Sequence, residues 1–387
     1  MHQDSIHQRN ILSSEEVQSL RRQFPIVKNK VFMNHAAFSP PCRAVKEAYD
    51  RRLHEWENMD VHRWSSEAAE AKKLFSKLIN CTADEIAFTP NTSTGISSIA
   101  TALPYRRGSN VVVTDLEYPA VTYTWLALQR KGSLETRFVK NRGGRIDPSD
   151  VEKKIDDRTV ALCISEVEFG NGFRNDMRTL AEIAHKHGAY VINDAIQSAG
   201  AVSVDIKHQD IDFLVAGGFK WLLGPVGTGY MYAREQLTEL ETTIVGASSV
   251  NPKREKLYIG TEYVPASSAK RFETGSYNII GYLAGKEALR LLTHLGSSKI
   301  EQRILHLTDY LIEKLQRMKV PIITPLERES RSGIVTFKVR RLRQALNKLT
   351  ARNFILAPRA GGLRASPHFY NTEKEIEKLA NELSRLI

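Results

Sequence analysis

The sequence predicts an α/β protein, with a mainly parallel seven-stranded sheet in a large domain and a second, smaller α+β domain. A chain of 387 residues exceeds the roughly 250 to 300 residues that one hydrophobic core accommodates, so two domains are expected. Short β-rich runs alternate with helical stretches up to about residue 233, which is typical of a parallel sheet covered by helices. After about residue 285 long helices replace this alternation.

The segment before the sheet is predicted to be mostly helical. Residues 11–23 are polar and contain Ser13-Ser14-Glu15-Glu16, which resembles a capped helix start. A short strand is expected at 31–34. Residues 44–78 are rich in charged residues and place apolar ones on one stripe, which predicts a surface helix packed against a core.

Seven β-rich runs are predicted to form the sheet. They are Ile86–Thr89, Asn110–Asp115, Thr136–Val139, Val160–Ser165, Ala189–Asp194, Phe213–Ala216 and Gly229–Ala233. Runs that are apolar on both faces are expected in strands covered on both sides. Helices such as 180–187, which Gly188 closes, lie between them and favour parallel connections.

The last part of the chain is predicted to form the smaller domain. Long helices are expected at 283–295 and 300–318, short strands at 320–324 and 332–338, and a final helix from Thr372. The predicted division is therefore an N-terminal helical segment, 1–30, that packs with the small domain, a large domain, 31–282, and a small domain, 283–387. No repeat or low-complexity segment argues for another architecture.

The net charge leaves several partners open. Lys and Arg number 55 against 44 Asp and Glu, which gives +11 and admits nucleic acid, an anionic membrane or a phosphorylated ligand. The basic run Val339-Arg340-Arg341-Leu342-Arg343, with Arg352, Arg359 and Arg364 nearby, is interpreted as a solvated face because no nucleic-acid motif accompanies it. Neither a nucleic-acid partner nor a membrane partner is expected.

Cysteine usage predicts a cytoplasmic protein. The three cysteines, Cys42, Cys81 and Cys163, are far apart and form no Cys-x-x-Cys pair, which argues against a disulfide framework or a zinc site. No metal is therefore expected. The N-terminus lacks the pattern of a secretory signal, and no apolar run of 18 or more residues is present.

The ends of the predicted strands carry the residues to inspect, because ligands of open α/β sheets bind there. After the first run comes Pro90-Asn91-Thr92-Ser93-Thr94-Gly95, in which hydroxyls and a glycine precede a helix. The free N–H groups of such a helix start bind phosphate. The alternative is that Thr92 or Ser93 simply caps the helix.

Two further strand ends add an acid and an amine. Asp194 ends one run and Gln197 follows it, while Lys220 lies among aromatic residues after another. Desolvation favours the neutral amine of a lysine, which is the form that condenses with a carbonyl group. Taken alone, each residue also fits an ordinary structural or solvated role.

Together, a phosphate site, a strand-end acid and a desolvated lysine predict pyridoxal 5′-phosphate (PLP) as cofactor. PLP chemistry needs a lysine Schiff base and an acidic partner for the pyridinium nitrogen. A dinucleotide or nucleotide enzyme is the rival class, but no Gly-x-Gly-x-x-Gly opens a helix after a strand and no Walker motif is present.

The chain resembles the class V aminotransferase family of fold type I PLP enzymes, from about residue 31 to the C-terminus. This family includes cysteine desulfurases, kynureninase and relatives of isopenicillin N epimerase. The motifs that carry the resemblance, in family order, are Met33-Asn34-His35-Ala36-Ala37, Phe88-Thr89-Pro90-Asn91-Thr92-Ser93-Thr94-Gly95, Glu117-Tyr118-Pro119-Ala120, Asn193-Asp194-Ala195-Ile196-Gln197-Ser198, Lys220 with Gly224-Pro225-x-Gly-x-Gly, Arg271-Phe272-Glu273-Thr274-Gly275-Ser276 and Arg364-Ala365-Ser366.

The resemblance implies a role for each matched residue. Lys220 would carry the Schiff base and move the Cα proton, Asp194 would keep the ring nitrogen protonated, and Tyr118 would stack on the ring. The remaining cofactor ligands would be Thr92 and Ser93 at the phosphate, Gln197 at the ring hydroxyl, and Ser276, which would reach the cofactor of a neighbouring chain in a homodimer. The substrate would be held by Arg364 at its carboxylate, together with Asn34 and His35.

Three departures from the family pattern bear on the reaction. Desulfurases carry a nucleophilic cysteine shortly before the carboxylate-binding arginine, whereas residues 356–363 contain none. Gly217 and Phe219 replace a serine and a histidine that bind phosphate in relatives. Ser165-Glu166-Val167-Glu168-Phe169 lacks the asparagine of the desulfurases and is more similar to the epimerase-like branch.

An aminotransferase-type reaction on an α-amino acid is therefore expected, with Cα deprotonation as its first step. One base suffices for transamination. An epimerase or β-lyase is the alternative, and epimerisation needs a second base, for which Tyr118 or His35 is the candidate. Cysteine desulfurase is less favoured, and a basic nucleic-acid-binding protein without catalysis is a remote alternative.

Overall fold

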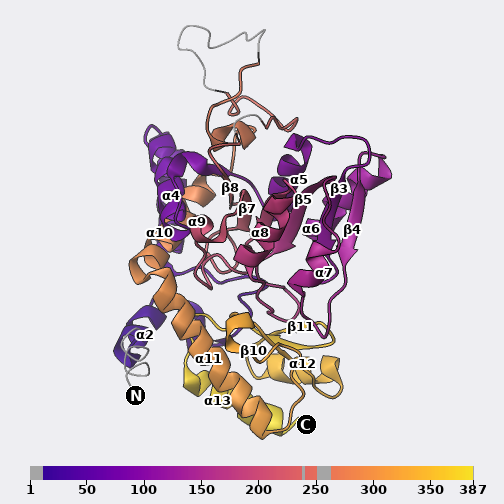
Figure 1. Cartoon of the computed structure of the whole chain (residues 1–387). Coiled ribbons are helices and arrows are strands. Elements are labelled where there is room, and N and C mark those ends of the chain that lie inside the picture. The colour runs from indigo at the N-terminus through magenta and orange to yellow at the C-terminus, as the bar shows by residue number, and fades with distance from the viewer. Residues whose placement is uncertain (1–11, 238–239, 251–262, 387) are drawn as a thin grey trace, which may run out of the picture.

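The computed structural model describes residues 12–237, 240–250 and 263–386, and its centre is a seven-stranded sheet (Figure 1). The strand order is β2-β8-β7-β6-β5-β3-β4, and β8 alone runs antiparallel to its neighbours. The bounds are β2 (Ile86–Phe88), β3 (Asn110–Thr114), β4 (Glu135–Val139), β5 (Thr159–Ser165), β6 (Tyr190–Asp194), β7 (Phe213–Gly217) and β8 (Gly229–Ala233). The predicted α/β class and mainly parallel sheet are confirmed.

Helices cover both faces of the sheet. Successive strand residues point to opposite sides, so each strand contributes side chains to a core on either face. On β3, Val111 and Val113 join a core with α5 (Thr92–Ala102) and α6 (Pro119–Arg130). Val112, between them, joins the core on the other face, to which α4 (Trp64–Leu78), α8 (Met177–Lys186) and α10 (Ile279–Leu295) contribute. Two short helices, α7 (Pro148–Glu152) and α9 (Ile206–Gln209), complete the large layer.

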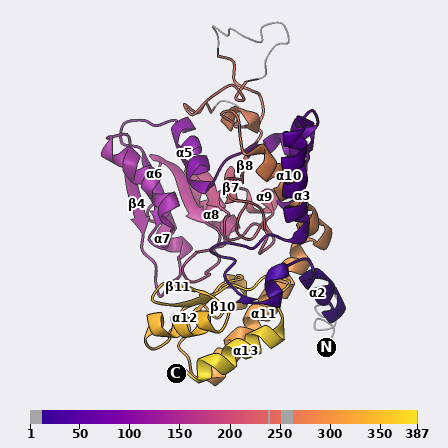
Figure 2. The same cartoon turned by 180° about the vertical axis from the view of Figure 1, so that it is seen from behind.

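The predicted helical stretch 44–78 is two helices. The first, α3 (Arg43–Glu57), ends before Met59, whose φ of 59° is left-handed and incompatible with continuing the helix. The second is α4. Both pack against α10, and Figure 2 shows α3 and α10 side by side at one edge of the molecule.

Below the large sheet in both views lies an α+β layer from the C-terminal part of the chain. Its antiparallel sheet has the order β11-β12-β9, from β9 (Val335–Phe337), β11 (Ala357–Arg359) and β12 (Gly362–Ala365). Helices α11 (Ser297–Arg317), α12 (Leu342–Ala351) and α13 (Glu373–Ser384) pack with it. The strand expected at 320–324 is only an isolated bridge between Ile322 and Phe337.

The described part of the N-terminal segment is tied to this smaller layer. Helix α2 (Ser14–Arg21) starts with the expected capping box between Ser13 and Glu16. Its last residue, Arg21, donates hydrogen bonds to the Tyr370 carbonyl and to the Glu375 carboxylate. Residues 1–11 of the predicted segment lie outside the described residues.

A second connection joins the start of the chain to the C-terminal layer. Strand β1 (Val31–Phe32) pairs in parallel with β10 (Phe354–Ile355). The predicted boundaries at 30/31 and 282/283 stay predictions. Strand β1, directly after the first boundary, pairs with β10 of the C-terminal layer, and α10 spans the second. Among the described helices, none has the length and apolarity needed to cross a bilayer.

Candidate active site

A cavity of about 200 Å³ opens at the carboxyl ends of β6 and β7. It lies where the large sheet meets the C-terminal layer, as predicted for an open α/β sheet. Seven of the ten site residues proposed from the sequence line it; the whole lining comprises Ala36, Ala37, Asn91, Thr92, Ser93, Tyr118, Ala120, Phe169, Asp194, Ile196, Gln197, Phe219, Lys220, Arg359 and Arg364.

Lys220 extends into this cavity from the turn after β7. Its Nζ lies 5.8 Å from the ring centroids of both Tyr118 and Phe219. Burial lowers the pKa of Lys220 to about 8; the negative charge of Asp194 opposes this shift, and the cations Arg364 and Arg359 add to it. At pH 7 roughly a tenth of the amine is therefore neutral, and the neutral form is the one that attacks a carbonyl group.

Asp194 is the last residue of β6 and is buried. The backbone N–H of Ile196 donates to its Oδ1 at 3.0 Å. Burial raises the pKa of Asp194 to about 6, and the positive charge of Lys220 works in the opposite direction. A buried carboxylate facing one side of the cavity can hold a proton on a ring nitrogen, because the two charges stabilise each other.

The start of α5 corrects the alternative that Thr92 or Ser93 caps the helix. Asn91 is the N-cap, and its Oδ1 accepts a hydrogen bond from Thr94 N at 2.9 Å. The hydroxyls of Thr92 and Ser93 are thus not used for capping. Thr92 Oγ1 is buried and has no hydrogen-bond partner, so the first turn presents a free hydroxyl to the cavity.

Arg364 reaches the cavity from β12 with only 1% of its surface exposed. Its Nη1 donates to the Phe169 carbonyl at 2.6 Å, while its Nε has no partner. Burial, and next the nearby Arg359, lower the pKa of Arg364 to about 9. A buried guanidinium with an unused N–H group is poised to bind a carboxylate.

Aromatic side chains form the walls of the cavity. Tyr118 is the N-cap residue of α6 and remains 47% exposed. Phe169 meets its ring edge-on with 5.1 Å between centroids. A Cβ atom at Gly217 would lie 3.1 Å from the Phe219 ring, so this ring fills the space next to the position where relatives have serine.

The other residues proposed from the sequence differ in whether they line the cavity and in whether their polar atoms are already bonded. Gln197 lines the cavity, but its amide already donates to the Ala36 carbonyl at 3.0 Å and accepts from Trp221 Nε1 at 2.9 Å. Asn34 Oδ1 is buried without a partner. Ser276 is exposed and does not line the cavity. The roles predicted for these residues stay predictions.

His35 is buried behind the cavity rather than in its lining. Its Nδ1 lies 2.9 Å from the Ser366 carbonyl, and its Nε2 lies 2.8 Å from the Tyr370 hydroxyl. Burial lowers the pKa of His35 well below its ordinary value. Both ring nitrogens are therefore occupied, and the predicted substrate contact stays a prediction that this arrangement does not favour.

Sequence reasoning missed Arg359 and the aromatic walls. The interpretation of Arg359 as part of a solvated basic face is wrong, because its side chain lines the cavity. The available signal was the hairpin pattern Ala360-Gly361-Gly362, which returns the chain and puts Arg359 near Arg364. For Phe169 and Phe219, the only feature of the sequence that pointed to the site was that they stand where relatives have polar residues.

The lining fits PLP as cofactor. The orphaned Thr92 hydroxyl and the free N–H groups of α5 suit a phosphate, Lys220 suits the aldehyde, and Asp194 suits the ring nitrogen. Tyr118 offers a flat ring at the cavity wall. The fold and this cavity define a PLP-dependent enzyme.

Comparison with known proteins agrees with this class. The family model for aminotransferase class V matches residues 31–379. An uncharacterized aminotransferase, YcbU, of Bacillus subtilis (strain 168) is 30% identical over 380 residues, covering 94% of this chain and 96% of that protein. A probable cysteine desulfurase of Methanothermobacter thermautotrophicus is 28% identical over 401 residues, covering 95% and 98%.

Solved structures show the same fold. The cysteine desulfurase of Thermococcus onnurineus NA1 superposes with a TM-score of 0.86 at 26% identity, covering 96% of this chain and 98% of its own. A variant of C-DES with glycine covalently linked to its PLP cofactor has a TM-score of 0.87 at 22% identity, covering 95% and 99%. The predicted PLP fold type I architecture is confirmed.

The chain belongs to the class V aminotransferase family.

Proposed function

We propose that this protein catalyses transamination of an α-amino acid with Lys220 as the Schiff-base and proton-transfer residue. The observation that carries the proposal is the grouping of Lys220, Asp194 and Arg364 around one small cavity. In this reaction the amino acid becomes a 2-keto acid, and a second 2-keto acid receives the amino group. When bound, PLP supplies the electron sink for the Cα–H bond that breaks.

Each of the three side chains has a distinct task. Arg364 binds the α-carboxylate through its free guanidinium face, which orients the Cα–H bond toward Lys220. Lys220 takes the proton from Cα at its Nζ and, for transamination, would pass it to the bound cofactor rather than back to Cα. Asp194 keeps a proton on the ring nitrogen. Thr92 and Ser93 bind the phosphate and hold the ring in register.

Cysteine desulfurase is disfavoured, although several curated relatives are named as such. The segment before Arg364 is a tight β11–β12 hairpin without cysteine. Cys42 and Cys163 are buried in the hydrophobic core. Burial raises the pKa of the Cys81 thiol, and Cys81 does not line the cavity, so no cysteine of the chain is placed to attack a sulfur atom of the substrate.

Epimerase and β-lyase activities are the alternatives that share the first proton transfer. Epimerisation needs a second base on the opposite face. His35 is withdrawn from this task because Ser366 and Tyr370 occupy its ring nitrogens. Tyr118, on the cavity wall, remains as a candidate, and the nature of the product separates these reactions.

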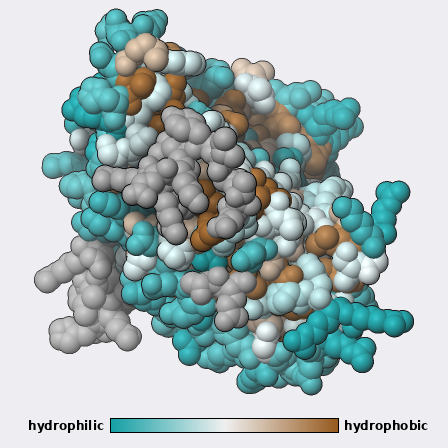
Figure 3. Space-filling model, turned by 90° about the horizontal axis from the view of Figure 1, so that it is seen from above, coloured by the Kyte–Doolittle hydropathy of each residue, from teal (hydrophilic) through white to brown (hydrophobic). Residues whose placement is uncertain are grey.

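We also propose a homodimer, in which Ser276 of one chain approaches the cofactor of the other. Several large apolar side chains stay exposed around the described surface: Phe38, Tyr123, Val226, Val245, Tyr263 and Val264. Figure 3 shows apolar side chains exposed on the upper face between polar rims. Such patches mark contact surfaces. An amino-acid substrate, no nucleic-acid or membrane partner and a cytoplasmic location remain the expectations from the sequence.

The test uses the purified full chain loaded with PLP. Borohydride reduction should fix the cofactor mass on the peptide that contains Lys220. Amino acids incubated in deuterated water should exchange their Cα hydrogen and yield the matching 2-keto acid. Release of pyruvate from a β-substituted substrate, or a change of chirality without keto acid, would favour lyase or epimerase instead.

The matched variant is Lys220→Ala. Loss of the proton-transfer residue should reduce exchange by about 10²- to 10⁴-fold. Exchange that persists at the wild-type rate in this variant would refute the role of Lys220, and cofactor mass fixed on another lysine would refute the site itself.

A further inference from the structure

Two arginines leave one β-hairpin on the same side and enter the active-site cavity. In the antiparallel pair β11–β12, Ala357 lies opposite Arg364 and Arg359 lies opposite Gly362. Alternate residues of a strand share a face, so Arg359 shares the face of Ala357. Arg359 is thus the diagonal cross-strand neighbour of Arg364, and both side chains line the cavity.

The turn between the two strands fixes this arrangement. It has two residues, Ala360 and Gly361, with φ values of 47° and 76°. Positive φ at both positions is the mark of a tight hairpin turn whose twist matches the strands. Because the loop has only two residues, the register of the β11–β12 pair fixes the spacing of the two arginine positions on the hairpin.

The cavity has an excess of positive charge. Its lining contains three cations, Lys220, Arg359 and Arg364, and one acid, Asp194. The only hydrogen bond of the Arg359 side chain among the described residues goes to its own neighbour, the Pro358 carbonyl, at 2.8 Å. Burial first, and the nearby charge of Arg359 second, lower the pKa of Arg364, as expected for two like charges in one cavity. Such a pair is costly unless anions occupy the cavity.

The anions of the proposed reaction leave one cation without a partner. The phosphate group is assigned to the start of α5, with Thr92 and Ser93. The substrate α-carboxylate is assigned to Arg364, and Asp194 is assigned to the ring nitrogen. Arg359 has no counterpart in this scheme, although it lies beside the α-carboxylate site.

We propose that Arg359 binds a second acid group at the end of the substrate side chain, so that the substrate is an acidic α-amino acid of the aspartate or glutamate type. The inference rests on the proposed function. Arg359 is a specificity-determining residue in this scheme: its planar fork matches a carboxylate, and its place next to Arg364 sets the distance between the two acid groups of the substrate.

The experiment measures binding rather than turnover. The PLP-loaded protein is titrated with 2-methylaspartate and with 2-aminoisobutyrate, two amino acids that lack a Cα hydrogen and differ in the side-chain carboxylate. The change in cofactor absorbance gives a dissociation constant for each. Wild-type protein should bind 2-methylaspartate roughly tenfold or more tightly than 2-aminoisobutyrate, as expected for one added charge-assisted contact.

Arg359→Gln should remove most of that preference while leaving the affinity for 2-aminoisobutyrate unchanged. Arg340→Gln, which changes an exposed arginine of the same layer, is the control and should keep the preference. The dissociation constant of PLP itself, measured by equilibrium dialysis, should be the same for all three proteins. Equal melting temperatures verify that the variants fold.

Three results would overturn the inference. Equal losses for both probes in Arg359→Gln would mean that Arg359 shares the α-carboxylate. Weaker PLP binding in that variant would make it a phosphate ligand. Absence of a preference in the wild-type protein would mean a neutral substrate. Failure of the wild-type protein to bind PLP would instead refute the proposed function, and the inference with it.

Discussion

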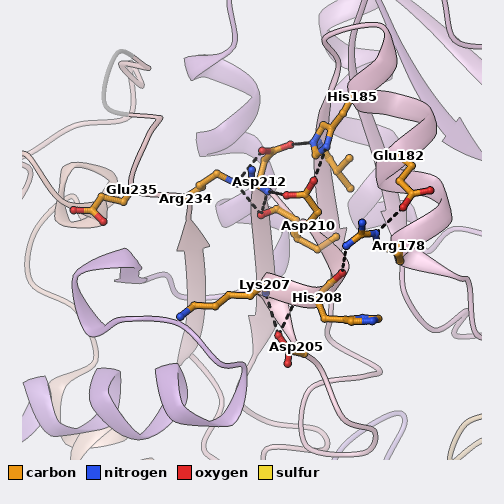
Figure 4. A network of polar contacts seen from close by, with 12 residues as sticks. Arg178, Glu182, His185, Asp205, Lys207, His208, Asp210, Asp212, Arg234 and Glu235 are labelled. Atoms are coloured by element: carbon orange, nitrogen blue, oxygen red, sulfur yellow. Dashed lines mark hydrogen bonds and ion pairs between the residues drawn. The ribbon is translucent and has the colours of Figure 1, made fainter.

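Two charged clusters at the ends of the sheet strands differ in how their charges are satisfied. Around the start of β7, His185 lies between Asp210 and Asp212, with distances of 3.2 Å and 2.8 Å. Arg234 bonds the same two acids, and Asp212 also accepts the Val191 backbone N–H (Figure 4). At the opposite ends of β6 and β7, Lys220, Arg359 and Arg364 face a single acid.

This difference separates structural charge from functional charge. The network of Figure 4 joins α8, β6 and Arg234, the residue after β8, and it needs no ligand. Among the described residues, the three cations of the candidate active-site cavity form no ion pair with an acid, which is unfavourable in the free protein and becomes favourable when anions bind.

Volume alone would have selected another site. A larger cavity of about 720 Å³ adjoins the network. Its arginines all have acidic partners: Asp150 for Arg142, Glu327 for Arg145, Glu301 for Arg174 and Glu182 for Arg178. The pattern of unsatisfied charge therefore favours the smaller cavity as the candidate active site, although the other cavity has the larger volume.

The largest expected effect concerns the stability of the network. Asp212→Ala removes a buried carboxylate that pairs with His185 and Arg234 and accepts the Val191 backbone N–H. It should lower the free energy of unfolding by about 1–3 kcal/mol, because Asp210 still pairs with both cations while the buried Val191 N–H loses its acceptor. Asp157→Ala removes the partner of His187, an acid whose side chain is 96% exposed, and should have no measurable effect. Urea denaturation measures both variants.

Two results would contradict the distinction between the structural network and the ligand-binding cavity. The two variants could have equal free energies of unfolding, or folded Asp212→Ala protein could fail to bind PLP. Either result would place the network in the function of the cavity.

The next effect concerns the amine in the cavity. The pKa of Lys220 lies at about 8. At pH values below 8, each increase of one pH unit therefore raises the neutral fraction of its amine about tenfold. The rate at which PLP condenses with the protein should therefore rise from pH 6 and level off above pH 8, as followed by stopped-flow absorbance. A rate that kept rising to pH 10 would show an ordinary, solvated lysine.

The smallest effect is a pH dependence of stability from His185. Its hydrogen bond with Asp212, opposed by burial, raises the pKa of His185. A raised pKa means that its stabilising contribution is complete below the unfolded-state value of about 6.5 and is lost as pH rises through the folded-state value. The melting temperature should fall more between pH 6 and pH 8 in the wild-type protein than in His185→Gln. An equal fall would assign the dependence to other groups.

Most of the fold could be predicted because the local sequence pattern of each segment indicates its secondary structure. Each sheet strand is a short apolar run bounded by turn residues, and all of the predicted runs form strands within two residues of their expected bounds. The strands of the C-terminal layer were harder, since β10, β11 and β12 have only two to four residues. The break at Met59 was also missed, because its surroundings keep helical spacing on both sides.

The sequence by itself determined the positions of the lysine proposed as catalytic, the strand-end acid and the helix start, since each of these follows its strand closely and its position does not depend on distant parts of the chain. Tertiary structure alone decided the rest. It gave the cap of α5 to Asn91, turned His35 toward Tyr370, and brought Arg359 beside Arg364. The physical reason is that the surroundings of a side chain, and whether its charge is satisfied, depend on residues that are distant in the sequence and meet only in the folded chain.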